Sequence, residues 1–249
     1  MMLTDRQKQL IVAIIQEFMK DASPVGSEGL KEIYNLAYSP ATIRNELADL
    51  VKEGYLYKEH SSSGRAPTTM GWRYYISEVL DEEQFSPVNE AFVRQKVFQY
   101  RFSIDRLLKE ATQALSEITN YIGVGLVENS YDGLQISPVY LSGTSNILTL
   151  KEFQDIELLK NFLAVLESNS LLANVFFKST IENQVNILVG DELGLKSMRS
   201  VATVYSILKI GKFDRVVIGV IGPARMNYSR VIPSIRSVAK SIQEATFGW

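Results

Sequence analysis

Hydrophobic positions in the first third of the chain recur at helical spacing, whereas those in the last half form alternating or continuous runs. A first helix is predicted from a cap at Thr4 to about Lys20, because Leu10, Ile14 and Phe18 fall on one stripe. A short helix capped by Ser27 is predicted next, and a third helix is predicted to begin after a cap at Ser39. These three helices with short connections predict a small helical domain at the N-terminus.

The third helix carries clear start and stop signals. Ser39 is a suitable N-cap and Pro40 suits the first helical position, while Gly54 ends the helix. Its buried stripe is expected to hold Ile43 and Leu47, so the short polar residues, an arginine and an asparagine near its start point outward. Arginine suits guanine and asparagine suits adenine, which predicts a base-contacting face. The residues of this face are Ser39, Ala41, Thr42, Arg44 and Asn45.

A β-hairpin with a polar tip is predicted directly after this helix, between residues 55 and 68. Residues 61–75 include two arginines and no acid, so the hairpin could lie along a phosphate backbone. The hairpin and the segment after it contribute these candidate DNA contacts: His60, Ser62, Gly64, Arg65, Thr68 and Arg73. Three helices and a hairpin form a winged helix-turn-helix. Periodicity alone also allows a small bundle or a protein-interaction module.

A domain boundary is predicted where acid and proline interrupt the pattern, between residues 81 and 90. Residues 90–119 then predict one long amphipathic helix with an apolar seam spaced by four and three. Part of that seam is a candidate dimerisation surface, namely Val97, Tyr100, Ile104 and Leu107. Further apolar residues lie off the seam, so packing on the following domain is an equal alternative to self-association.

The last part of the chain alternates predicted strands with predicted helices, which indicates an α+β domain. Strands are expected on either side of the Asp132-Gly133 turn, and helices at residues 152–167 and 228–243. The remaining strands are expected at residues 175–177, 185–189, 201–208 and 216–221. The predicted organisation is a DNA-binding domain at 1–80, a linker with a long helix at 81–119, and an α+β domain at 120–249.

Composition narrows the function. The chain has no cysteine, which excludes disulfides and zinc-thiolate sites, and its net charge of −2 argues against a general polyanion binder. Positive charge is instead placed locally in the hairpin. The first residues lack a signal-peptide pattern and no apolar run reaches the length of a membrane span. A cytoplasmic protein without membrane contact is expected.

Catalytic chemistry finds little support in the residues. His60 is the only histidine, and no phosphate-binding loop, dinucleotide fingerprint or nucleophile elbow is present. Asp191 and Glu192 are adjacent, which suits a turn better than a catalytic carboxylate pair. The segment from Gly222 to Arg230 could bind an anion at a helix start, but a tight connection with Arg225 and Arg230 in ion pairs is favoured. We expect no enzyme activity, no metal and no cofactor.

Three ordered blocks of sequence resemble the HrcA family of heat-inducible transcription repressors. They are SPATIRNELADL with the hairpin and GWRYY from residue 71, then VYLSGTSNIL with EFQDIELLKNFLAVLE, then GVIGPARMNYSRVIPSIRSVA. Glu59 and Trp72 depart from the usual family residues, proline and tyrosine. The resemblance implies a winged helix-turn-helix, a GAF-like distal domain, an inverted-repeat operator before chaperone genes, release on heat stress, and dependence on the GroEL chaperonin.

One departure from the family is large. Family members carry part of the sheet and an inserted dimerisation domain between the regions matching Asn120-Tyr121 and Val139-Tyr140-Leu141, where this chain has only a short turn. The chain therefore resembles a compact member without the insertion. The main hypothesis is a homodimeric repressor of chaperone genes. Two alternatives are a ligand-responsive regulator whose GAF-like domain binds a metabolite, and an enzyme with a DNA-binding appendage.

Overall fold

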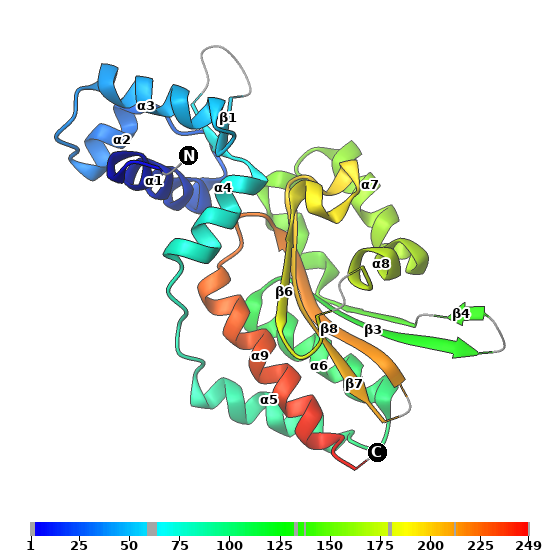
Figure 1. The fold of residues 1–249 in the computed structure, drawn as a ribbon. Helices are drawn as coiled ribbons and strands as arrows, with labels where there is room; N and C mark the ends of the chain where they lie inside the picture. Colours follow the sequence, from blue (N-terminus) through cyan, green and yellow to red (C-terminus); the bar gives the residue numbers. More distant parts are fainter. Residues whose placement is uncertain are drawn as a thin grey trace. The chain divides into compact units, whose positions relative to one another are not determined.

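Two compact units make up the protein, one spanning Met1–Asp81 and the other Glu82–Trp249. The computed structural model describes residues 3–58, 64–131, 134–136, 138–178, 181–211 and 213–248 (Figure 1). Each unit has its own buried core and is described separately. The mixed α+β fold class expected from the sequence is confirmed.

The first unit is a winged helix. Three helices precede a small two-stranded antiparallel sheet, and a helix with a π-helical last turn follows. Its elements are α1 (Asp5–Asp21), α2 (Ser27–Tyr34), α3 (Pro40–Lys52), β1 (Leu56–Tyr57), β2 (Ala66–Pro67), α4 (Thr69–Tyr74) and the π-helical turn Tyr75–Val79.

Local sequence signals set where these helices begin. Thr4 caps α1 in a reciprocal capping box, in which its hydroxyl accepts from the Gln7 N–H at 3.2 Å and the Thr4 N–H donates to the Gln7 amide oxygen at 2.9 Å. The expected cap of α2 was one residue off, because Gly26 is the N-cap and Ser27 is already helical. The cap of α3 by Ser39 is confirmed.

The second unit is built on a six-stranded, fully antiparallel sheet. The strand order is β5-β3-β8-β7-β6, and β4 continues the β5 edge by pairing with the far end of β3. The strands are β3 (Ile122–Tyr131), β4 (Leu134–Ile136), β5 (Val139–Ser142), β6 (Val185–Val189), β7 (Val201–Ile210) and β8 (Phe213–Pro223). A sheet of this kind with helices on both faces is GAF-like.

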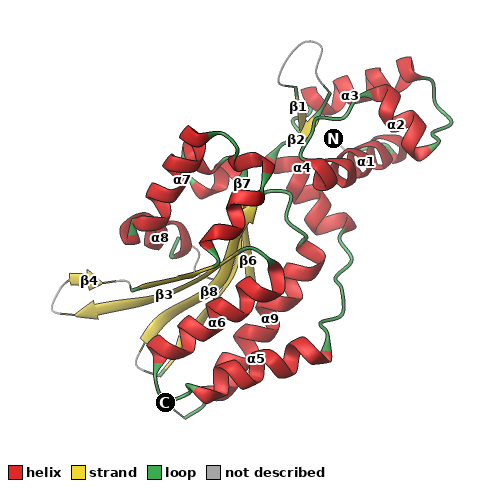
Figure 2. Cartoon of the chain, turned by 180° about the vertical axis from the view of Figure 1, so that it is seen from behind, coloured by secondary structure: helices red, strands yellow, loops and turns green. Residues whose placement is uncertain are grey.

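Helices cover both faces of this sheet (Figure 2). One face is packed by α6 and α9, with α5 lying against both helices, and α7 and α8 lie over the other face (Figures 1 and 2). The five helices are α5 (Pro87–Gln99), α6 (Ile104–Thr119), α7 (Ile156–Glu167), α8 (Asn169–Phe176) and α9 (Tyr228–Ala245).

Gly123 explains how closely α6 approaches the sheet. A Cβ atom at this position would lie 2.0 Å from the carbonyl oxygen of Thr112 in α6, so no larger residue fits there. Thr112 is fully buried, and its hydroxyl bonds to the Ser142 hydroxyl of β5 at 3.0 Å. The glycine in β3 therefore allows the helix and strand backbones to touch.

The expected single helix over residues 90–119 is wrong. The chain turns at residues 100–103 and separates α5 from α6, which pack against each other as a hairpin joined by a Lys96–Glu110 ion pair at 3.1 Å. Val97 and Leu107 are fully buried within this unit, while Tyr100 and Ile104 are half-buried at the turn. The apolar spacing is kept because both helices bury a stripe of this kind within the unit, so the four residues do not form one continuous surface along a single helix.

The strand expected at residues 175–177 is also wrong. Ser168 caps α8, and this helix includes Val175 and Phe176. A short apolar run cannot be distinguished from a buried helix segment by periodicity alone, and the cap that decides it lies several residues earlier. Both side chains are buried, so the pattern was correct about burial and wrong about conformation.

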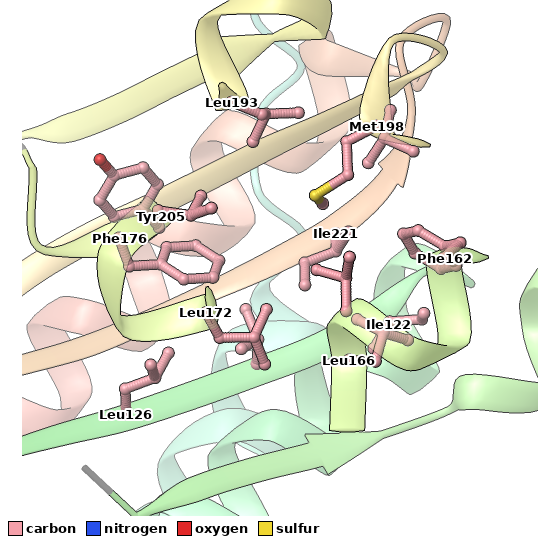
Figure 3. Close-up of a cluster of buried hydrophobic side chains, with 14 of the residues drawn as sticks. Ile122, Leu126, Phe162, Leu166, Leu172, Phe176, Leu193, Met198, Tyr205 and Ile221 are labelled. Atoms are coloured by element: carbon pink, nitrogen blue, oxygen red, sulfur yellow. The ribbon is translucent and has the colours of Figure 1, made fainter. Parts of the chain in front are cut away.

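The core under α7 and α8 is a packed hydrophobic cluster that fills the space between these helices and the sheet (Figure 3). Phe176 meets Tyr205 of β7 edge to face, with ring centroids 4.9 Å apart, and Phe162 of α7 lies 4.7 Å from Phe153. Met198 and Leu193 close the same cluster. This side of the sheet is therefore a core of apolar side chains.

Leu107→Ala should lower the free energy of unfolding by about 2–5 kcal/mol, because it empties a fully buried position between α6 and its neighbours. Phe102→Ala, at the neighbouring turn with 81% of its surface exposed, is the matched control and should change stability by less than about 0.5 kcal/mol. Urea unfolding followed by circular dichroism measures both. If Leu107→Ala changed the free energy of unfolding as little as Phe102→Ala does, Leu107 would not be part of the packed core.

Candidate nucleic-acid interface

The α3 helix presents two different faces. Ile43, Leu47 and Leu50 are buried where α3 packs against α1 and α2. The opposite face at the start of the helix is exposed and carries Arg44 and Asn45. The predicted stripe is therefore confirmed, and its burial fixes which side chains face outward.

The start of α3 is held by its cap. The Thr42 N–H donates to the Ser39 hydroxyl oxygen at 3.1 Å, and the two hydroxyl oxygens lie 2.8 Å apart. Pro40 occupies the first helical position. Ser39 and Thr42 are thus engaged with each other, so any DNA contact they make has to be shared with the cap.

Arg44 and Asn45, unlike Ser39 and Thr42, are not engaged in the helix cap. Both side chains are exposed, and across the described segments neither has a hydrogen bond or ion pair to another residue. Ala41 is exposed beside them. A guanidinium and an amide on the exposed face of a helix start, with no hydrogen bond to other described residues, can each make two hydrogen bonds to a base edge.

Tyr34, the last residue of α2, holds this helix against α1. Its hydroxyl oxygen lies 3.0 Å from the Glu17 carboxylate and 3.2 Å from the Gln16 amide oxygen, both in α1, and donates a hydrogen bond to these acceptors. Burial, reinforced by the bond to Glu17, raises the pKa of Tyr34 to about 12, and the bond from Lys20 lowers the pKa of Glu17. The tyrosine therefore stays protonated and continues to donate, which ties α2 to α1.

The hairpin is anchored at its base. Arg65 and Val25 form a backbone bridge with N–H to oxygen distances of 2.8 and 2.9 Å, so the segment after α1 adds to the β1–β2 sheet. A Cβ at Gly64 would lie 2.5 Å from the backbone of Pro24 and Val25, which gives this glycine a packing role. The predicted contacts His60 and Ser62 lie outside the described residues.

Thr68 has a structural role that could not be predicted from its place in the sequence. Its hydroxyl donates to the Gly54 carbonyl at 2.6 Å and lies 3.0 Å from the Tyr55 carbonyl, and it accepts from the Gly71 N–H at 3.2 Å. It therefore caps α4 and joins it to the end of α3. Its predicted DNA contact would compete with these bonds.

The two arginines of the hairpin region are only half-exposed. Arg65 lies at the base of the hairpin, and Arg73 lies in the last turn of α4. Beside Arg73, Trp72 is buried and meets Phe18 of α1 edge to face at 6.2 Å. These contacts fix α4 on α1, and they place both cations near the surface of the same unit.

One contact in this unit was not predicted from the sequence. Arg6 in α1 forms an ion pair with Glu46 in α3, and its guanidinium lies over the ring of Tyr38. The only sequence signal was an acid next to the proposed base-contacting residues. No spacing rule links residues so far apart in the sequence.

Carboxylates and cations elsewhere have structural roles. Asp191 pairs with Arg199 at 2.9 Å, and Glu192 accepts from the Val189 N–H at 2.8 Å, so this acidic pair belongs to a turn as expected. Arg225 makes a two-bond ion pair with Glu152, which confirms half of the expected pairing at the α9 start. Arg230 is exposed and has no ion pair within the described chain, so its expected pairing is wrong.

In the described residues, no group of three or more histidine, cysteine or acidic side chains is placed to hold a metal ion. None of the described helices is long and apolar enough to cross a membrane.

A winged helix with an outward-facing polar helix, followed by a GAF-like domain, defines a transcription regulator. Residues 126–232 match the family model described as the HrcA protein C terminal domain. Over nearly its full length the chain is similar to the HrcA family of heat-inducible transcription repressors.

Curated relatives extend the match to both units. The heat-inducible transcription repressor HrcA of Symbiobacterium thermophilum is 27% identical over 338 aligned positions, which cover 98% of each chain. The protein of the same name from Clostridium acetobutylicum is also 27% identical, with 97% of each chain covered. The 338 positions exceed the 249 residues of this chain, so at least 89 of them have no residue here.

A solved structure shows the same fold. The crystal structure of a hypothetical protein at 2.2 Å resolution has a TM-score of 0.72 and 17% sequence identity, covering 98% of this chain and 99% of that one.

Thr68→Ala should lower the free energy of unfolding by about 1–2 kcal/mol, because it removes a helix cap. Thr68→Ser keeps the hydroxyl and should recover most of that loss. Urea unfolding of both variants measures the difference. A variant with unchanged stability and weakened DNA binding would instead support the contact predicted from the sequence.

Proposed function

We propose that this chain is a homodimeric repressor whose winged helices bind an inverted-repeat operator upstream of chaperone genes and leave it on heat stress. The observation that carries this proposal is the exposed, uncommitted pair Arg44 and Asn45 at the start of α3, in a chain whose relatives are named heat-inducible transcription repressors over nearly their full length. The GroEL chaperonin is the proposed partner of the repressor, and the cytoplasm is its proposed location.

The exposure of each side chain suggests which part of the DNA it contacts. Arg44 and Asn45 are proposed to contact base edges, with Ala41 beside them. Arg65, Arg73 and the hairpin tip with His60 and Ser62 are proposed to contact phosphates. Because the chain is slightly acidic overall, its affinity depends on base contacts and on joining two winged helices rather than on bulk charge.

Dimerisation follows from the proposed operator. Each half of an inverted repeat holds one winged helix, and joining the two raises the affinity without any new base contact. The relatives' additional aligned positions are proposed to contain their inserted dimerisation domain, which this chain lacks. The distal unit, and not a continuous α5–α6 seam, is then the remaining place for the dimer contact.

The experiment is selection of binding sites from random double-stranded DNA by the purified full chain. Affinity for the selected sites is then measured from about 20 to about 50 °C, a range that reaches the temperatures at which many domains begin to unfold. An inverted repeat should be enriched, and it should be released before the chain unfolds by circular dichroism. Failure to enrich any symmetric site would contradict the proposal. Enrichment of sites that stay bound until unfolding would remove its heat-release part.

Arg44→Ala and Asn45→Ala should each weaken binding to the selected operator by about 1–3 kcal/mol, and weaken binding to scrambled DNA much less. Lys52→Ala, at the other end of the same helix and exposed, is the matched control and should leave the ratio of the two affinities unchanged. Fluorescence anisotropy measures both affinities. Equal losses on both DNAs would assign Arg44 and Asn45 to phosphate contacts.

Arg65→Ala should weaken specific and non-specific binding similarly, because a phosphate contact carries no sequence information. The slope of log affinity against log salt should fall by about one. The measurement is a salt titration on operator and scrambled DNA. An unchanged slope would remove Arg65 from the phosphate contacts.

A further inference from the structure

The first half of α3 contains an acid as well as the proposed base contacts. Glu46 follows Asn45 directly, and an uncompensated carboxylate this close to DNA would repel its phosphates. The Glu46 side chain is only 13% exposed, because it is turned toward Arg6 of α1 and forms an ion pair with it. The negative charge is therefore neutralised within the protein.

Arg6 makes a second contact that involves the turn before α3. Its guanidinium carbon lies 5.2 Å from the ring centroid of Tyr38, which directly precedes the cap Ser39. One planar cation thus touches both the segment leading into α3 and the middle of α3. A lysine could supply the charge but not the flat stacking surface.

Arg6 is itself held in position. It lies in the first turn of α1, between Thr4 and Gln7 of the capping box, and Gln7 is buried. Ion pairs between two exposed groups contribute little to stability, but here one partner is largely shielded and the guanidinium is stacked. This is the geometry of a contact that fixes orientation.

We infer that Arg6 is a positioning residue for operator recognition, which holds α3 in register through Glu46 and Tyr38 and cancels the charge of Glu46 beside the DNA. The inference rests on the proposed function, since it concerns how the base-contacting face is aimed. It assigns to α1 a role in specificity although Arg6 lies outside α2, α3 and the hairpin.

The test is a double-mutant cycle of Arg6→Gln, Glu46→Gln and the two together, with affinity measured on the selected operator and on scrambled DNA. Arg6→Gln should lower the ratio of these affinities roughly tenfold, the scale of a coupled charge pair. The double variant should lose no more than the Arg6→Gln variant, because both changes remove the same contact. Additive losses would overturn the coupling through Glu46.

The salt dependence separates positioning from direct contact. The Arg6→Gln, Glu46→Gln double variant, which removes both charges of the pair, should leave the slope of log affinity against log salt unchanged, whereas loss of a residue bound to phosphate would lower it by about one. A lowered slope would overturn the inference and make Arg6 a DNA contact. Lys8→Gln is the matched control, since Lys8 lies on the same helix, carries the same charge and pairs only with the exposed Asp5 at 3.7 Å within the described chain.

Two further measurements separate the positioning role from a purely structural role. Arg6→Lys should keep the affinity for scrambled DNA and recover only part of the specificity ratio, because it retains charge without stacking. If Arg6→Gln lowers the unfolding temperature while the ratio stays at the wild-type value, the positioning role is overturned. Failure of the wild-type chain to select any inverted repeat would instead contradict the proposed function, independently of Arg6.

Discussion

The burial of one apolar stripe on α3 is the constraint on which the interface depends. Ile43, Leu47 and Leu50 have almost no exposed surface, so rotation of α3 about its axis would bring apolar groups into water. The base-contacting candidates project outward as a consequence of this packing. Arg6, Tyr34 and Thr68 then add polar contacts that connect α3 and its neighbours to α1 and α4.

Much of the fold could be predicted because the signals that determine it are local. Thr4 and Ser39 cap helices as their positions suggest, and the alternating or apolar runs of β6, β7 and β8 are strands. The α5–α6 region failed for a physical reason. A heptad spacing describes which face is buried, and it cannot tell whether that face meets a second chain or a neighbouring helix of the same chain.

The interface itself was predictable only in its exposed half. Arg44 and Asn45 follow from the helical pattern, whereas the roles of Gly64, Thr68 and Arg6 depend on contacts between distant segments. Gly64 shows the limit well, since its place in a hairpin suggests flexibility at the tip. Its lack of a side chain instead allows the hairpin base to pass directly over the backbone of Pro24 and Val25.

The pairing of β3 has a consequence for the order in which the chain folds. On one edge β3 pairs with nearby β5, but on the other it pairs with β8, whose residues come about 100 positions later, so the centre of the sheet has a high contact order. The winged helix has all its partners within the first 81 residues. During synthesis it can form while the uncharged first part of β3, from Ile122 to Val127, still has an open edge. A nascent chain of this topology leaves the apolar edge of β3 without its partner until β8 has been synthesised, so the sheet is completed late.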